Sequence, residues 1–194
     1  MDFTDSIKAS LSEARDVLDE FMSGTGNIQA IGSAAGILVE AVGSGKKILA
    51  CGNGGSMTDA MHFAEEMSGV FREKRKAFPA IAISDPSHIT CTANDYGFDA
   101  VFSRYVEAIG QTGDVLLAIT TSGNSMNIIR AAEAARDKGM KVVGLTGRSG
   151  GLLAGIADCE ICVRGRKYSD RIQEVHIKVL HILVQLVEQS LGQP

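Results

Sequence analysis

The sequence lacks the features that mark a membrane protein or a general nucleic-acid binder. No apolar segment approaches the roughly 20 residues that cross a bilayer, and residues 1–5 hold two acids and no apolar run that would begin a secretory signal. The formal net charge is −4, and residues 72–76 are locally basic. Because nucleic-acid affinity needs clustered Lys and Arg, we interpret 72–76 as a solvated loop. We therefore expect a cytoplasmic protein without a membrane or nucleic-acid partner.

Cysteine is scarce as well, with four residues in the chain. Without an export signal these are expected to be reduced thiols. Cys159 and Cys162 have a C-x-x-C spacing, but residues 158–163 have the pattern of a strand, on which positions i and i+3 face opposite sides. No second cysteine pair completes a structural zinc site. We predict that all four cysteines are packing residues.

The motifs of common nucleotide enzymes are also missing. Residues 43–47, Gly-Ser-Gly-Lys-Lys, lack the first glycine of a Walker loop, the hydroxyl after its lysine and its position after a strand. Residues 52–57 end in Met57 where a dinucleotide fingerprint has glycine, and no second strand ends in an acid about 20 residues later. An enzyme that uses ATP or a dinucleotide is therefore disfavoured.

What the chain contains is a regular alternation of helical and apolar strand patterns. With 194 residues and 45% hydrophobic content, it can bury one core. Two helical patterns, 7–21 and 28–42, come first, with a break at 24–27. The expected strands lie near 47–51, 79–83, 114–119, 141–145 and 159–163, and a long helix begins at about residue 169.

This order predicts an α/β fold. Strands that alternate with helices form a five-stranded parallel sheet with helices on both faces. Gly139 is expected at the left-handed position that ends the helix before the fourth strand. No linker divides the chain, so we predict a single domain over 1–194, with an N-terminal helical pair in 1–45 and the α/β core in 46–194.

A glycine loop follows the first strand. Residues 48–51 read as a buried strand, and residues 52–56, Gly-Asn-Gly-Gly-Ser, allow a tight turn into a helix. Ser56 and Asp59 have the spacing of a capping box, and a helix that starts there directs free N–H groups at whatever enters the loop. The loop therefore predicts a cradle for an anion.

The same helix carries an acid/base pair. His62 and Glu66 are four residues apart, so both project from one face. Beside an anion cradle, this pair suggests that a small phosphorylated substrate touches the loop with one end and the side chains with the other. A solvated helix pair is the alternative.

A second loop resembles the first. Residues 117–126 repeat the pattern of 49–57, and both read as strand, loop and helix start. Ligands of open parallel sheets bind beyond the carboxyl ends of neighbouring strands. The second loop carries hydroxyls at Thr120, Thr121, Ser122 and Ser125, which can donate to phosphate oxygens. We assign the phosphate to this loop; ordinary caps and turns are the alternative.

The C-terminal helix is apolar almost all round, which predicts burial. His181 within it is either a core histidine or a site residue, and the loops favour the latter. Gln173 and His181 are eight residues apart, about 12 Å along a continuous helix, so one metal could hardly be reached by both. A common site would need a helix break near Gln173 or contributions from different subunits. His176 is the other candidate histidine.

Taken together, residues 47–69, 120–125 and 170–178 resemble the sugar isomerase (SIS) domain family, and 80–85, 94–95 and 102–105 extend the match. The resemblance implies a flavodoxin-like fold, a homotetramer and an aldose-ketose isomerase. The implied reaction interconverts sedoheptulose 7-phosphate and D-glycero-D-manno-heptose 7-phosphate for bacterial lipopolysaccharide synthesis. Family members that do not catalyse but bind a protein such as a replication initiator, and aminosugar phosphate isomerases, remain alternatives.

The resemblance also implies roles for individual residues. Catalysis falls to Glu66 and His181. Zinc, one per subunit, would be held by His62, Glu66, Gln173 and His181. The implied substrate contacts are Asn53, Gly54, Gly55, Ser56, Glu66, Asn94, Asp95, Thr120, Thr121, Ser122, Ser125 and Gln173.

The chemistry suits these residue types. Aldose-ketose exchange passes through an enediol, so it needs one base at carbon and one group that moves protons between oxygens. Glu66 is expected in the first role and His181 in the second. Zinc would instead polarise the carbonyl, and the two mechanisms compete because a zinc-bound carboxylate is a poorer base. Val70 stands where the family often has arginine; Arg72 or Arg75 could replace it, or the hydroxyl loop could suffice.

Overall fold

The computed structural model describes residues 1–164 and 168–192. Its helices are α1 (Thr4–Ser23), α2 (Thr25–Gly43), α3 (Gly55–Ser68), α4 (Pro86–Tyr96), α5 (Ser103–Ile109), α6 (Met126–Asp137) and α7 (Asp170–Leu191). Its strands are β1 (Ile48–Gly52), β2 (Ala80–Ala82), β3 (Val115–Thr120), β4 (Lys141–Gly147) and β5 (Cys159–Val163). Short 3-10 turns are η1 (Phe98–Ala100) and η2 (Leu153–Gly155).

The five strands form one parallel sheet in the order β2-β1-β3-β4-β5, which confirms the predicted fold class. Each predicted strand is present, β5 has its predicted bounds, and the ends of the others differ by at most two residues. Chain order reverses at β1, since β2 lies on one side of it and β3 on the other. Loops that leave β1 and β3 in opposite directions open a crevice at the carboxyl end of the sheet.

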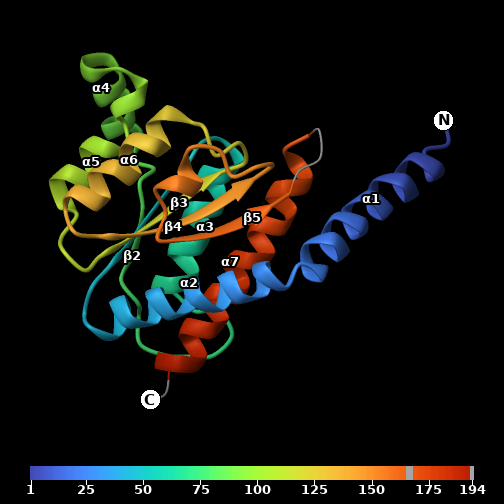
Figure 1. Cartoon of the computed structure of the whole chain (residues 1–194), viewed down its shortest axis with the longest axis horizontal. Helices are drawn as coiled ribbons and strands as arrows, with labels where there is room; N and C mark the ends of the chain where they lie inside the picture. The colour runs from blue at the N-terminus through green and yellow to red at the C-terminus, as the bar shows by residue number, and fades with distance from the viewer. Residues whose placement is uncertain (165–167, 193–194) are drawn as a thin grey trace.

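Helices cover both faces of the sheet (Figure 1). On one face α2, α3 and α7 pack against alternate strand residues such as Ile48 and Leu117. On the other, residues of α5 and α6 pack against the intervening residues, such as Leu49 and Leu116. The strands are therefore buried on both sides, as their continuous apolar runs predict. Gly139 has φ 72° and follows the end of α6, which confirms that predicted stop.

The N-terminal helices are longer than predicted. Only Gly24 separates α1 from α2, so the predicted break at 24–27 is too wide. Arg171 of α7 holds α1 through Glu13, at 3.1 Å, and Ser10, at 2.6 Å. Figure 1 shows α1 reaching beyond the sheet. Among the described residues, no helix has the length and apolar character needed to cross a bilayer.

Two predictions about packing need correction. All four cysteines are free, but Cys91 is exposed on α4, so it is not a packing residue. The helix α7 buries residues such as Val175, Leu180 and Leu183, yet Ile182 is 40% exposed. Within this chain α7 therefore has one buried face and one open face, because its apolar residues outnumber the positions that the sheet and α3 can cover.

His176 is a core histidine. It is fully buried, and its Nε2 lies 2.9 Å from the carbonyl oxygen of Thr146 at the end of β4. Burial lowers the pKa of His176 from 6.5 to about 4, and the bond to Thr146 only partly offsets this. The ring is neutral at physiological pH and faces the sheet, so it is not a site residue in this chain.

Stability should fall in acid because of His176. The unfolded chain takes up this proton near pH 6.5 and the native state only near pH 4, so stability is lost as pH falls through that window. One pKa unit is worth about 1.4 kcal/mol, which gives an upper limit of roughly 3 kcal/mol. Urea unfolding of the wild type and His176→Gln at pH 7 and about pH 4.5 measures the difference. An equal loss in both proteins would contradict this account.

Candidate active site

The glycine loop turns into α3 without a side-chain cap. Gly54 is the N-cap with φ 55° and ψ −122°, a conformation that favours glycine, and the helix begins at Gly55. The predicted capping box of Ser56 and Asp59 is therefore wrong, because Ser56 lies inside the first turn and is buried. The amides of Ser56 and Met57 bond back to Asn53 and Gly54. Because these two N–H groups are already bonded, the backbone N–H groups that would bind an anion must come from the loop before Ser56.

A reciprocal amide pair joins this loop to the start of α6. Asn53 Nδ2 donates to Asn127 Oδ1 at 2.9 Å, and Asn127 Nδ2 donates to Asn53 Oδ1 at 2.8 Å. Asn127 is buried, and sequence reasoning missed it. The repeat between the two loops could have indicated it, since Asn127 follows the second loop directly. The pair fixes the two loops beside each other and occupies the Asn53 amide, which leaves the Asn53 backbone for a ligand.

The hydroxyl loop gathers its side chains at the carboxyl end of β3. Thr120 Oγ1 lies 3.2 Å from Ser125 Oγ and 3.4 Å from Ser122 Oγ. Thr121 Oγ1 donates to Ser169 Oγ, at 3.4 Å, just before α7. Rotatable hydroxyls that already converge can redirect their hydrogens to an anion. The structure thus brings together three of the four hydroxyls to which the sequence assigns a phosphate, while that of Thr121 is directed to Ser169.

Gln173 lies at the same end of the sheet. A Cβ added to Gly55 would come within 2.6 Å of Gln173 Nε2, so the glutamine amide rests on the first turn of α3. The glycine loop, the hydroxyl loop and the first turn of α7 therefore surround one region. A larger residue at position 55 would displace the end of the Gln173 side chain from this place.

A second cluster lies farther along α3. His62 Nε2 is 3.0 Å from Glu66 Oε1, and His181 Nε2 is 3.3 Å from His62 Nε2 and 3.7 Å from Glu66 Oε1. The Glu66 side chain is 12% exposed, while those of His62 and His181 are 45% and 40% exposed. Glu66 Oε2 is buried without a hydrogen-bond partner among the described residues. One carboxylate oxygen is thus unpaired, although it is shielded from solvent.

The cluster has the composition of a metal site. One ligand atom from each of His62, Glu66 and His181 lies within 4.8 Å of the other two. Imidazole nitrogens with a carboxylate oxygen are ligands that zinc and related divalent ions prefer. The three residues could therefore hold a metal ion together.

Gln173 and His181 occupy different levels of one unbroken helix. α7 runs from Asp170 to Leu191 without interruption. Gln173 lies against Gly55, whereas His181 lies against His62 and Glu66, so α3 and α7 run side by side in the same direction. The break considered near Gln173 is absent. If Gln173 joins the cluster, it must come from a different subunit.

Asn94 and Asp95 are not brought to this cluster within the chain. Both are exposed on α4, where Asn94 Nδ2 donates to Asp95 Oδ1 at 2.7 Å and the Cys91 thiol faces Asp95 Oδ2 at 3.5 Å. Figure 1 shows α4 at one end of the molecule, away from α7. A role for these two residues in the same site would require another subunit.

Of the two arginines that could replace the one expected at position 70, only Arg72 is available. Val70 is 58% exposed. The Arg75 side chain is fully buried and donates to the carbonyl oxygens of Glu66, Met67, Gly69 and Lys76. The interpretation of 72–76 as a solvated loop is therefore wrong at Arg75. The Arg72 guanidinium lies over the Phe71 ring, 5.4 Å from its centroid, and that ring contacts His181.

Comparison with known proteins agrees with this arrangement. A family model of the SIS domain matches residues 11–147, so the chain belongs to the SIS domain family. Within the family it groups with the phosphoheptose isomerases. Those of Yersinia enterocolitica and Proteus mirabilis are 59% and 58% identical to it over 189 residues, which cover 97% of this chain and 98% of theirs. A solved phosphoheptose isomerase from Neisseria gonorrhoeae superposes with a TM-score of 0.90 at 38% identity, covering 97% of this chain and 100% of that one.

The amide pair should support both loops. Replacing either Asn53 or Asn127 by alanine leaves a half-buried amide unpaired, which should cost about 1–3 kcal/mol of unfolding free energy. The double variant should lose less than the sum, because neither amide is then left alone. Equilibrium urea unfolding of the wild type, the two single variants and the double variant measures this double-mutant cycle. Strictly additive losses would show that the pair contributes nothing as a unit.

Proposed function

We propose that this protein interconverts sedoheptulose 7-phosphate and D-glycero-D-manno-heptose 7-phosphate, and so serves lipopolysaccharide heptose synthesis. The observation that carries the proposal is the meeting of Glu66 and His181, 3.7 Å apart, from helices more than a hundred positions apart in sequence. A carboxylate and an imidazole are the two groups that enediol chemistry needs. The high identity to phosphoheptose isomerases over nearly the whole chain supports the choice of substrate.

Substrate binding is proposed at the carboxyl end of the sheet. Thr120, Thr121, Ser122 and Ser125 would donate hydroxyl hydrogens to the phosphate, and the backbone from Asn53 to Ser56 would face the sugar. Gln173, on the first turn of α3, would bind a sugar hydroxyl. These groups hold the anionic end while leaving the carbonyl end for the acid/base pair.

One subunit holds the phosphate region and the acid/base pair at opposite ends of α3. Gly55 and Glu66 are eleven residues apart, about 16 Å along the helix axis. We therefore propose a homotetramer in which neighbouring subunits complete each site. The exposed rings of His62 and His181, the open face of α7 and the exposed Asn94 and Asp95 support this, since each is available to a neighbour.

The proton transfers follow from the geometry. The Glu66 carboxylate would take the proton from the carbon next to the carbonyl and return it to the adjacent carbon, so the carboxylate ends unchanged. His181 would move a proton between the two oxygens, which completes the exchange of alcohol and carbonyl. His62, at 3.0 Å from Glu66 Oε1, would fix the orientation of the carboxylate beside His181.

Zinc is the proposed cofactor, one ion per subunit. His62, Glu66 and His181 fit it by ligand type and spacing, and the unpartnered oxygen of Glu66 is consistent with a missing ligand. Bound zinc would supply a Lewis acid that polarises the substrate carbonyl. Gln173 would complete the set only from a neighbouring subunit. Glu66 would be a weaker base as a zinc ligand, so its role would differ between the metal-bound and the metal-free mechanism.

Turnover should depend on both members of the pair. Glu66→Gln and His181→Gln keep size but remove the proton-transfer groups, so kcat should fall about 10²- to 10⁴-fold. NMR of sedoheptulose 7-phosphate incubated with each protein follows the new heptose phosphate. His88→Gln, outside the site, is the matched control. If the wild type has no turnover and Glu66→Gln behaves as the wild type does, a non-catalytic scaffold is favoured. If the wild type converts only an aminosugar phosphate, an aminosugar phosphate isomerase is favoured.

Metal binding should require the cluster. Calorimetric titration of metal-free protein with Zn²⁺ should give one site per subunit in the wild type and in His88→Ala. His62→Ala and His181→Ala each remove an imidazole ligand, so affinity should fall at least tenfold. A fall in Gln173→Ala would support a ligand from the neighbouring subunit. Wild-type affinity in His62→Ala would exclude the cluster as the zinc site.

A further inference from the structure

The end of α3 is held by one arginine. Arg75 Nη2 donates to the carbonyl oxygen of Glu66 at 2.7 Å, and Arg75 Nη1 donates to those of Met67 at 2.8 Å and Gly69 at 3.2 Å. The last carbonyls of a helix have no partner within it, and a cation there also suits the helix dipole. One side chain thus binds the peptide group of the proposed base directly.

Arg75 itself is fixed on two further sides. Its guanidinium lies over the Phe78 ring, 4.2 Å from the centroid, and its side chain is fully buried. Its Nε has no hydrogen-bond partner in the described part of the chain and lies 3.8 Å from Glu188 Oε2. A buried cation at this distance from a buried carboxylate is stabilised by it.

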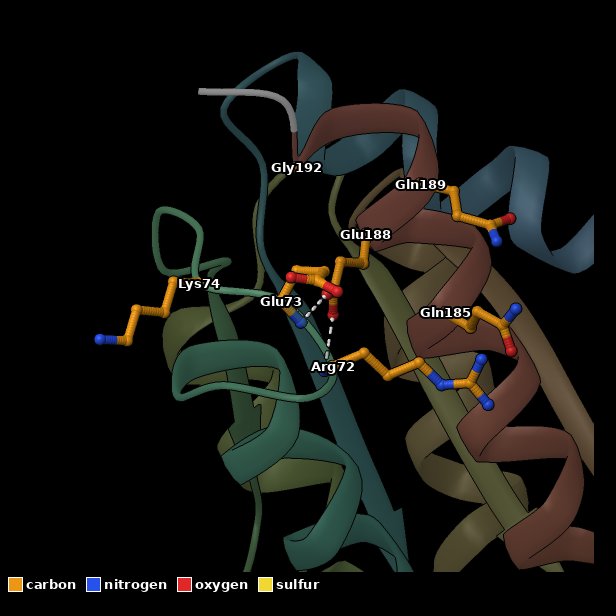
Figure 2. Close-up of a pocket in the computed structure, with 7 residues that line it drawn as sticks. All are labelled: Arg72, Glu73, Lys74, Gln185, Glu188, Gln189 and Gly192. Carbon is orange, nitrogen blue, oxygen red and sulfur yellow. Dashed lines mark hydrogen bonds between the residues drawn. The ribbon is translucent and has the colours of Figure 1, made fainter.

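Glu188 connects this arginine to α7. Its carboxylate accepts from the backbone N–H of Glu73 at 2.6 Å and of Arg72 at 3.4 Å. Figure 2 shows the carboxylate turned toward that backbone, beside a cleft of about 540 Å³. Glu188 lies seven residues after His181, two turns farther on the same side of α7. The contacts therefore run from Glu66 through Arg75 and Glu188 to the helix of His181.

We propose that Arg75 and Glu188 are positioning residues that set the separation of Glu66 and His181. This rests on the proposed isomerase function. Neither residue touches the 3.7 Å contact between the pair, but together they fix the two helices that supply it. A displacement of about 1 Å in a catalytic group can lower the rate a hundredfold. A cap that only stabilised α3 would have no such effect on the folded enzyme.

Arg75→Met tests the proposal, with Lys74→Met as matched control. Both remove one positive charge from the same loop, but Lys74 is exposed. In Arg75→Met we expect kcat to fall about ten- to a hundredfold, with KM within about threefold, because the phosphate is bound elsewhere. Lys74→Met should match the wild type. Arg75→Lys should recover part of kcat, since an ammonium still donates to the same carbonyls.

Two further measurements keep the result decisive. Zinc affinity should fall about tenfold in Arg75→Met and not in Lys74→Met, whether or not the protein turns over a sugar phosphate. If Arg75→Met does not fold, Glu188→Gln is tested in its place. The new glutamine oxygen can still accept from the Glu73 backbone N–H, but the negative charge that faces Arg75 is gone. In Glu188→Gln we expect kcat to fall severalfold. A folded Arg75→Met with wild-type kcat and zinc affinity would overturn the proposal. An inactive wild type would instead overturn the isomerase function.

Discussion

The site depends on the packing of α3 against α7. These helices lie side by side in the same direction, with Gln173 on Gly55 at one end, His181 on His62 and Glu66 in the middle, and Glu188 on the following loop at the other. The buried face of α7 holds this alignment through the main core. A slip of one helical turn would move His181 by about 5.4 Å and separate it from the carboxylate. The roles proposed for His62, Glu66 and His181 all require this alignment of α3 with α7.

The sheet imposes the second constraint. Because β1 and β3 are neighbours in a parallel sheet, their following loops emerge at the same edge, and the Asn53–Asn127 pair locks them together. The anion region is thus built from rigid elements, whereas the acid/base cluster lies on a helix surface that one chain leaves open. One subunit therefore contains all the residue types that the proposed reaction needs, but it does not enclose them in one site.

Sequence alone predicted the parallel sheet, its strands and the hydroxyl loop, because continuous apolar runs and glycine turns are local signals. It also proposed His62, Glu66 and His181 as site residues; the structure brings them together through the packing of α7. The capping box at Ser56 failed because Gly54 could adopt a positive φ and start the helix earlier. The burial of Arg75 and the partner of Asn53 were missed because both depend on contacts between distant segments.

The common direction of α3 and α7 also bears on the basic stretch at residues 72–76. Both helices end beside residues 72–76, so two C-terminal ends, each equivalent to about half a negative charge, are concentrated at one corner of the protein. Arg75 bonds to one end directly, and Arg72 and Lys74 line the cleft at the other. Part of this basic stretch therefore neutralises the protein's own backbone field, since Arg75 bonds directly to the end of α3.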